Sequence, residues 1–212
     1  MRATHMMKHS TSRHQRGITL IESLVAIVVA ALGILGILGV QMRTLTDTQT
    51  TVRRAQAIRL IEDLGERLKV HPNALGSLGS YVNNWGTALA SSPGKDCRSA
   101  LCTPAELVAY DLWAWRTLVR ASLPATDVNI FLAAGETVPE DRRQLGVMIS
   151  WRENERDNDT AYKNPISTST DGGTVSCPAD RTCHLQYIPV SARCAPYLMG
   201  GTPQYFCPGA KL

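Results

Sequence analysis

The sequence predicts an α+β protein in which a long N-terminal helix packs on a small antiparallel sheet and disulfides staple the C-terminal region. Three observations predict this class. An apolar run at residues 18–40 continues into an amphipathic stretch, and no proline occurs before Pro72. Apolar and polar residues alternate in the second half of the chain, as they do in half-buried strands. Six cysteines all lie beyond residue 96, in stretches rich in residues that favour loops.

The segment before the apolar run, residues 1–17, is basic and carries no acid. Its basic residues are Arg2, Lys8, Arg13 and Arg16. Removing these four from the 22 Lys and Arg residues leaves 18, equal to the 18 Asp and Glu residues, so the net charge of +4 belongs to this segment. A protein that binds nucleic acid needs a basic face on its folded part. The charge distribution therefore argues against a nucleic-acid partner.

The apolar run itself has the length of a membrane span. Residues 18–40 contain one charged side chain, Glu22. As a helix they would extend roughly 35 Å, which is enough to cross a bilayer. A removable secretory signal has a shorter apolar core of about 7–15 residues. With the basic flank on its N-terminal side, the run predicts a single span with a cytoplasmic N-terminus and an exported, disulfide-bonded remainder.

The junction between leader and span carries a resemblance. The leader ends in Gly17, and Glu22 is the fifth residue after it, in the stretch GITLIESL. This resembles the class III leader and N-terminal helix of type IV pilins and type II secretion pseudopilins. The resemblance implies that a prepilin peptidase cuts between Gly17 and Ile18 and methylates the new amine of Ile18. It also implies that Glu22 pairs with that amine in a neighbouring subunit, which explains a carboxylate in an apolar segment.

The sequence departs from the family's pattern at two places. Ile18 stands where the family usually has phenylalanine, and Gly39 stands where many major pilins carry a helix-kinking proline. Gly33, Gly36 and Gly39 recur at every third residue. They mark either a close helix–helix contact or a place where the helix melts locally.

From residue 41 to about residue 70 the helix is expected to become amphipathic and to lie on a sheet. The expected apolar stripe consists of Leu45, Val52, Ala55, Ile58, Ile61, Leu64 and Leu68. The stripe leaves heptad register after Val52, which argues against a solitary coiled coil. His71 and Pro72 end the helix. Residues 73–96 follow as a long loop, which Tyr81, Val82 and Trp85 are expected to anchor.

A second helix is expected after Thr103. Thr103 suits the N-cap, Pro104 the first turn, and Glu106 the capping-box position, while Arg116 and Arg120 would favour the C-terminal end of the helix dipole. The surrounding block resembles the minor pilins of the PilV type. Its matching residues are Cys97, Cys102, Thr103, Pro104, Ala105, Glu106, Tyr110, Asp111, Trp113 and Trp115.

Strands are expected at residues 128–132, 145–151 and 184–190, where apolar and polar residues alternate. Pro189 indicates that the last of them lies at a sheet edge. The simplest arrangement is an antiparallel meander against the long helix. Tyr197, Tyr205 and Phe206 would then form either an exposed contact surface or a cover over the sheet edge.

The six cysteines are expected to form disulfides rather than a metal site, because they include no C-x-x-C pair. Six cysteines allow 15 connectivities, and proximity along the chain favours neighbours. The favoured pairs are Cys97–Cys102, Cys177–Cys183 and Cys194–Cys207.

No catalytic residue, metal or cofactor is expected. The motifs of hydrolases, P-loop proteins, zincins and dinucleotide-binding proteins are all missing from the sequence, and only His71 and His184 follow the leader. Alternating acids at residues 153–159, namely Glu153, Glu155, Asp157 and Asp159, would suit either Ca²⁺ or a solvated turn. We favour the turn, since charge runs usually face water.

We therefore interpret the chain as a structural minor pilin of a type IV pilus and not as an enzyme. Residues 1–17 would be the leader, 18–40 the membrane and assembly helix, 41–71 its amphipathic continuation, and 72–212 a periplasmic or extracellular head. The expected partners are the prepilin peptidase, other minor pilins, the major pilin and the inner-membrane assembly platform. The protein would wait in the inner membrane and then enter the pilus, helping to prime assembly, with a tip position and adhesion as further roles.

Two alternatives stay open. A minor pseudopilin of a type II secretion system would share every motif and differ in its partners. A membrane-anchored periplasmic enzyme or binding protein would keep its leader and would tolerate a neutral replacement of Glu22.

Overall fold

The computed structural model describes residues 19–136, 138, 142–153, 166–192, 194, 196–198 and 203–207. The chain forms two compact units, Met1–Asp47 and Thr48–Leu212. Gly17 and Ile18 lie outside the described residues, as do three of the four alternating acids, Glu155, Asp157 and Asp159.

Within the first unit the chain is one helix from Leu20 onward. Helix α1 spans Leu20–Val70, so its C-terminal turns belong to the second unit. The backbone carbonyl of Thr19 accepts hydrogen bonds from the N–H groups of Glu22 and Ser23 at the start of the helix. The helix is unbroken through the three glycines at positions 33, 36 and 39. A Cβ atom at any of them would have no neighbouring atom within 4 Å, so nothing in the single chain requires glycine there.

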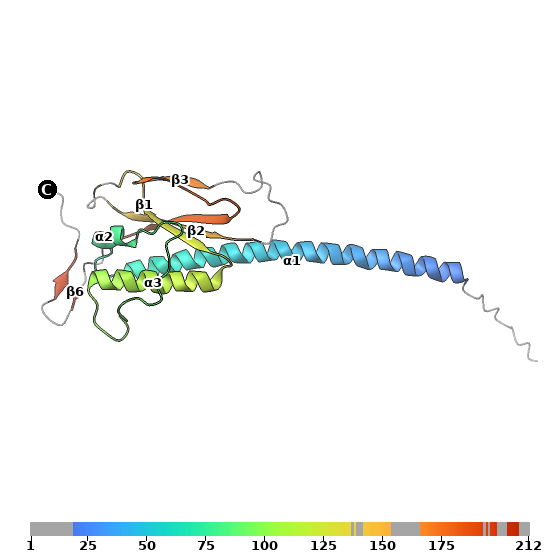
Figure 1. Cartoon of the computed structure of the whole chain (residues 1–212), viewed down its shortest axis with the longest axis horizontal. Coiled ribbons are helices and arrows are strands. Elements are labelled where there is room, and N and C mark those ends of the chain that lie inside the picture. Colours follow the sequence, from blue (N-terminus) through green and yellow to red (C-terminus); the bar gives the residue numbers. More distant parts are fainter. Residues whose placement is uncertain are drawn as a thin grey trace, which may run out of the picture. The chain divides into compact units, whose positions relative to one another are not determined.

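The second unit is an α+β fold, which confirms the predicted class (Figure 1). After α1 its helical elements are α2 (Ala74–Ser77), η1 (Leu78–Tyr81) and α3 (Pro104–Ser122). Its strands are β1 (Asp127–Leu132), β2 (Gln144–Trp151), β3 (Ser167–Thr170), β4 (Gly173–Ser176), β5 (Thr182–Pro189), β6 (Pro196–Tyr197) and β7 (Gln204–Tyr205). The main sheet is antiparallel in the order β1-β2-β5, and β3-β4 and β6-β7 form two small hairpins. Pro189 ends the edge strand β5, as predicted.

The buried stripe of α1 differs from the predicted one. Its members are Ala57, Leu60, Ile61, Leu64, Gly65 and Leu68. Of the predicted stripe, Leu45, Val52 and Ala55 are exposed and Ile58 is half-buried. The spacing of three and four residues is right, but it begins at Ala57, because the core covers only the last turns of the helix. A sequence pattern shows which side chains share a face and does not show how far the facing sheet extends.

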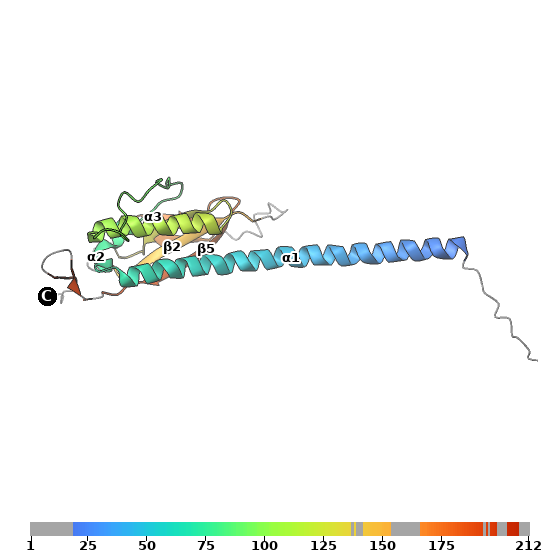
Figure 2. The same cartoon turned by 90° about the horizontal axis from the view of Figure 1, so that it is seen from below.

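Helix α3 lies along the C-terminal part of α1 and runs in the opposite direction (Figure 2). Three contacts fix the pairing: His71 with Pro104, Arg67 with Asp111, and Leu60 with Trp115. The predicted capping box is present, since Thr103 Oγ1 accepts from the Glu106 N–H and the Glu106 carboxylate accepts from the Thr103 N–H. A capping box is formed by residues only three positions apart, so the sequence alone predicts the start of this helix correctly.

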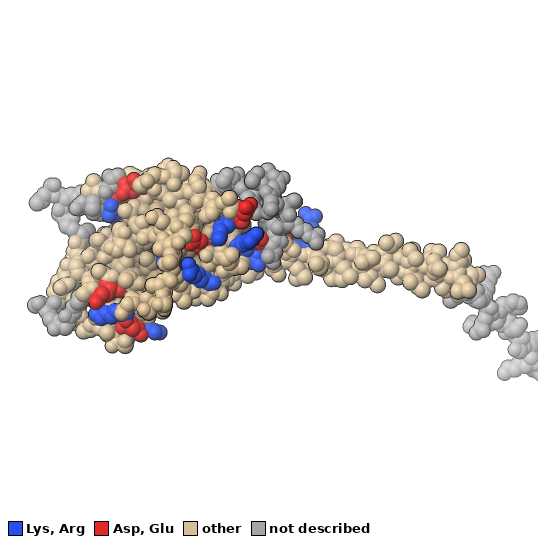
Figure 3. Space-filling view, viewed as in Figure 1, with Lys and Arg blue, Asp and Glu red and all other residues tan. Residues whose placement is uncertain are grey.

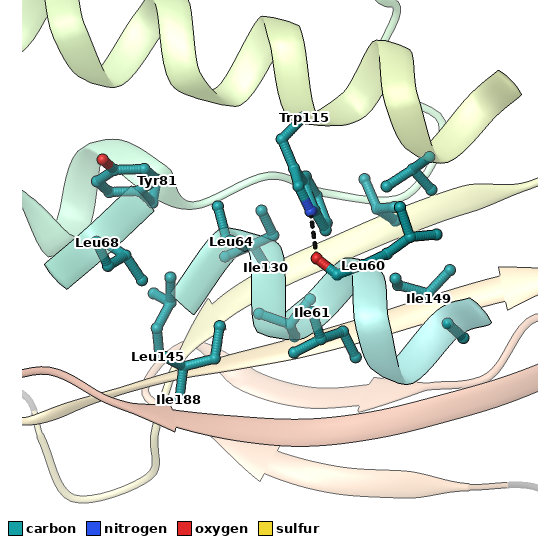
Figure 4. Packing of buried hydrophobic residues seen from close by; sticks show 14 of the residues in the cluster. Leu60, Ile61, Leu64, Leu68, Tyr81, Trp115, Ile130, Leu145, Ile149 and Ile188 are labelled. Atoms are coloured by element: carbon teal, nitrogen blue, oxygen red, sulfur yellow. Dashed lines mark hydrogen bonds between the residues drawn. The ribbon is translucent and has the colours of Figure 1, made fainter. Parts of the chain in front are cut away.

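Figure 4 shows the core between the two helices and the main sheet. Trp115 is fully buried and its Nε1–H donates to the backbone carbonyl of Leu60 at 2.6 Å. On the sheet side, Ile130, Leu145 and Ile188 face α1. The core is therefore built from three elements, namely the C-terminal turns of α1, helix α3 and the main sheet.

Strand β2 is buried on both faces, although its alternation of apolar and polar residues is typical of a half-buried strand. Leu145, Val147 and Ile149 belong to the main core, whereas Met148 belongs to a second cluster with Phe131 and Cys183. Half-buried side chains from β3–β4, from β5 and from the loop after η1 pack against that cluster, among them Trp85, Val175, Leu185 and Tyr187. The hairpin β3–β4 was missed because its Ser and Thr residues give no apolar alternation.

Gly146 on β2 is required by this second cluster. A Cβ atom built there would lie 2.2 Å from Cε2 and 2.5 Å from Cζ of Phe131. Phe131 is 5% exposed and its ring meets that of Tyr187 edge to face, so it has little room to retreat. We expect Gly146→Ala to lower the free energy of unfolding by about 2 kcal/mol through overpacking. Chemical unfolding of the full chain in detergent micelles measures the loss.

Gly172→Ala is the matched control for this substitution, because a Cβ atom there has no neighbour within 4 Å. It should leave the stability unchanged. Adding Phe131→Leu to Gly146→Ala should then cost less than the two single changes added together, since the smaller side chain removes the clash. Equal losses in the two glycine variants would contradict the packing argument.

The segment expected to be a loop, residues 73–96, begins with α2 and η1. Tyr81 is fully buried and Trp85 is half-buried, as expected, but Val82 is 40% exposed. The anchor is instead Asn83, which exchanges backbone hydrogen bonds of 2.8 and 2.9 Å with Ile130 and donates from Nδ2 to the Val128 carbonyl at 2.8 Å. The segment thus closes the free edge of β1, which a count of apolar residues does not reveal.

A buried polar cluster joins the end of α1 to α3. Arg67 Nη1 lies 3.4 Å from Asp111 Oδ1. Burial raises the pKa of Asp111, and this effect outweighs the nearby charge of Arg67, which by itself would lower that pKa. His71 Nε2 lies 3.0 Å from the Pro104 carbonyl, and its Nδ1 accepts from the Asn73 N–H. Burial lowers the pKa of His71. These bonds suit the neutral ring with its hydrogen on Nε2.

Arg116 does not serve the helix dipole as expected. It is buried and donates to the carbonyls of Thr87 and Ala88, so it holds the loop against α3. Arg120 does lie in the last turn of α3.

Three disulfides are present: Cys97–Cys102, Cys177–Cys183 and Cys194–Cys207. The first closes a loop before α3, the second joins the connection after β4 to β5, and the third encloses the β6–β7 hairpin. Each links nearby residues of the chain, with sequence separations of 5, 6 and 13.

Tyr197 donates its hydroxyl hydrogen to the Cys102 carbonyl, which ties the β6–β7 hairpin to the first disulfide loop. Tyr205 is exposed.

Candidate functional site: the exposed apolar helix

The N-terminal part of α1 exposes all of its large apolar side chains. From Leu20 to Leu45 every Val, Ile, Leu and Met is between 49% and 92% exposed. In Figure 3 this part of the helix is tan over nearly all of its visible surface, whereas charged side chains gather on the C-terminal unit. The segment therefore has no apolar partner within the described part of its own chain.

Such a surface is unstable in water. Each square ångström of exposed apolar surface costs about 25 cal/mol relative to burial, and soluble monomers rarely show continuous apolar patches of this extent. Helix α1 is the one helix in the described residues that is long and apolar enough to cross a membrane. A bilayer or a set of similar helices would satisfy this surface, because beyond the first turn the backbone hydrogen-bonding groups are already paired inside the helix.

Glu22 is the single acid of this segment and lies in the first turn of α1. Its side chain is exposed, and within the described residues its carboxylate has no ion pair or hydrogen bond. A carboxylate in a first turn is favoured by the partial positive charge of the helix N-terminus. That attraction is modest, so Glu22 remains open to a cation supplied from outside the described residues.

The other residues singled out from the sequence do not assemble into a reactive centre. Glu153 accepts a hydrogen bond from Trp151 Nε1 at 2.9 Å. His71 is held by backbone groups, and the pKa of His184 is lowered first by burial and then by the charge of Arg54. Among the residues that the structure describes, no group of three or more His, Cys, Asp or Glu could hold a metal ion.

Two family models match the chain. Residues 12–38 match the prokaryotic N-terminal methylation motif, and residues 39–113 match type IV pilin Tt1218. The first match covers the leader junction and the exposed apolar segment. The second covers the amphipathic part of α1 and the first half of α3, including the capping box. The chain matched no curated protein and no solved structure.

The two adjacent matches agree with the geometry of α1. Members of the pilin family are generally structural proteins rather than enzymes. These parts of the chain are thus similar to a type IV pilin and to the N-terminal methylation motif, and α1 is long and apolar enough to anchor the protein in a membrane.

Proposed function

We propose that the protein is a minor pilin of a type IV pilus that helps to prime filament assembly. Prepilin peptidase would remove residues 1–17 by cutting between Gly17 and Ile18 and would methylate the amine of Ile18. The match to the methylation motif over residues 12–38 supports this processing. The proposed partners are other minor pilins, the major pilin and the inner-membrane assembly platform.

The exposure of every large apolar side chain from Leu20 to Leu45 carries this proposal. The same surface suits two surroundings in turn, first the lipid bilayer and then the helices of neighbouring subunits. Transfer between them costs little, because both surroundings are apolar. A filament could therefore be built from subunits stored in the membrane, with the C-terminal unit remaining outside the cytoplasm, where its three disulfides are stable.

In this proposal, Glu22 determines the axial offset between neighbouring subunits. A buried carboxylate is costly unless a cation lies beside it. The amine of Ile18 in a neighbouring subunit would supply that cation at one axial offset only. Among pilins the PilV type is supported by the block from Cys97 to Trp115, in which the first disulfide and the Thr103–Glu106 capping box are both formed. A place at the pilus tip and a part in adhesion belong to the same proposal.

Replacing Glu22 with glutamine tests this role. We expect Glu22→Gln to be inserted and processed normally but to be depleted at least about tenfold from sheared filaments, since a buried amine without its partner costs several kcal/mol. Immunoblots of the membrane and filament fractions measure both quantities. Glu62→Gln is the matched control, because Glu62 is an exposed acid farther along the same helix. It should enter filaments at the wild-type level.

The N-terminus of the protein purified from its own membrane tests the processing step. The expected mass is that of residues 18–212 with one methyl group added on Ile18. An intact Met1, together with normal behaviour of Glu22→Gln, would contradict the pilin proposal and favour an anchored enzyme or binding protein. Copurification with a secretion system instead of a pilus would favour the pseudopilin alternative.

A further inference from the structure

The C-terminal unit contains a hollow that the assembly role does not use. It lies between β1, the β3–β4 hairpin and the segment that follows η1, and has a volume of about 520 Å³. Its walls include Trp85 and Phe131 as aromatic surfaces and Asn84, Asn129 and Thr170 as polar ones. This size and this mixture of apolar walls with a few polar groups are typical of sites for small molecules.

Asn129 supplies an unused hydrogen-bonding group in this hollow. The residue is 3% exposed, and its Oδ1 atom is buried without a hydrogen-bond partner. It sits on β1 opposite Met148, where an apolar side chain would complete the second cluster. Buried polar atoms are nearly always bonded, and an unbonded one lowers stability. Because Oδ1 itself has almost no accessible surface, the amide must shift slightly toward the hollow before a ligand can donate a hydrogen bond to it and remove this cost.

The β1 side of the hollow does not accept an added strand. The edge of β1 is already occupied, because Ile130 exchanges both backbone hydrogen bonds with Asn83 and the Leu132 carbonyl accepts from the Asp171 N–H. Recognition by backbone pairing, as an extended peptide would require, is therefore blocked along this edge. A ligand must be held by the side chains that line the walls.

The lining also argues against a charged ligand. Asp171 is the one charged residue among those that line the hollow, and its carboxylate lies 3.9 Å from the guanidinium of Arg142. Among the described residues, no basic side chain lines the walls to attract an anion, and one carboxylate with a cationic neighbour is a poor cation site. The remaining polar groups are amides and hydroxyls, which suit a neutral ligand rich in hydroxyl groups.

Trp85 provides a fixed aromatic surface for such a ligand. Its Nε1–H donates to the Ser176 carbonyl at 3.1 Å, which ties the ring to β4 and fixes its plane. A pyranose ring has an apolar C–H face and a rim of hydroxyl groups, so it can stack on an aromatic side chain while its rim bonds to amides. We propose that this hollow binds a neutral saccharide, with its apolar face on Trp85 and a hydroxyl group donating to Asn129 Oδ1.

Saturation-transfer NMR on the full chain tests the proposal. The protein is held in a zwitterionic detergent without a sugar headgroup, and the probes are the methyl glycosides of glucose, galactose, mannose and N-acetylglucosamine. We expect transfer to the ring protons of at least one glycoside. Asn129→Leu should weaken its binding about tenfold by removing the acceptor, while the unfolding midpoint stays the same or rises because an unbonded polar atom is lost.

Trp85→Leu should also weaken binding, and Trp113→Leu is its matched control. Trp113 is likewise half-buried and donates its Nε1–H to a loop carbonyl, that of Ala90 at 3.0 Å, but it does not line the hollow. Binding that survives both Asn129→Leu and Trp85→Leu, or that Trp113→Leu abolishes equally, would overturn the assignment. An absence of transfer to all four glycosides would overturn it as well.

Discussion

Replacing Trp115 with leucine is expected to lower the free energy of unfolding of the C-terminal unit by about 3 kcal/mol. Trp115 is 0% exposed and lies where α1, α3 and the main sheet meet. Leucine leaves a cavity there, because three elements of regular structure surround the ring and cannot move independently to fill it. The hydrogen bond to the Leu60 carbonyl, 2.6 Å long, is lost at the same time.

Urea unfolding of the full chain in detergent micelles, followed by near-ultraviolet circular dichroism, measures this loss. Trp115→Phe should cost about 1 kcal/mol, since it keeps most of the volume and loses the hydrogen bond. Trp113→Leu is the control for removing a tryptophan from the same helix, because Trp113 is only half-buried. A loss as large for Trp113→Leu as for Trp115→Leu would contradict the position of the core described above.

Replacing Arg67 with methionine is expected to cost about 2 kcal/mol at neutral pH. The side chains of Arg67 and Asp111 are 26% and 11% exposed, so removing the cation leaves a mostly buried carboxylate without its ion-pair partner. Lys69→Met is the matched control on the same turn of α1. Its ion pair with Glu66 joins side chains that are 61% and 69% exposed, and pairs of that kind contribute at most about 0.5 kcal/mol.

The loss caused by Arg67→Met should shrink as the pH falls. Burial raises the pKa of Asp111 in the folded state above its ordinary value of 3.8. At pH values between the ordinary pKa and the raised pKa, the folded state therefore binds more protons than the unfolded state. Lowering the pH through this range therefore stabilises the fold, and it does so more in the variant, where no Arg67 charge opposes protonation. His71 titrates in the opposite sense, because its pKa is lowered by burial. It is present in both proteins, so most of its own contribution cancels when the difference between their unfolding free energies is followed downward from pH 7. The remaining change comes from the acids that face Arg67, of which Asp111 is more buried than Asp63. A difference that is constant or grows on acidification would contradict the argument.

The elements that the sequence predicted well are those specified by neighbouring residues. The capping box of Thr103 and Glu106, the end of α1 before His71 and the edge position of Pro189 all depend on residues within a few positions of each other. The candidate functional site, the apolar part of α1 with Glu22, is also specified by neighbouring residues. The sequence shows such an apolar run with an acid near its start, and no knowledge of tertiary contacts is needed to recognise it.

Features that need a distant partner were misjudged or missed. The buried stripe of α1 begins at Ala57 and not at Leu45, since the position of the facing sheet decides which turns are covered. Val82 seemed an anchor by its apolar side chain, yet Asn83 holds the segment through hydrogen bonds to β1. The β3–β4 hairpin was missed because packing on Phe131 and Met148, and not an apolar pattern of its own, holds it in place.

The sequence by itself determined the α+β class, the long helix with its exposed apolar part, and the acid at the start of that helix, because each follows from composition and spacing along the chain. Only the tertiary structure decided that β2 is buried on both faces, that Asp111 and Arg67 meet, and that Asn129 lines a hollow while its Oδ1 atom is buried without a hydrogen-bond partner. The physical reason is that burial and electrostatic environment depend on which surfaces the fold brings together, and those surfaces are separated by tens of residues along the chain.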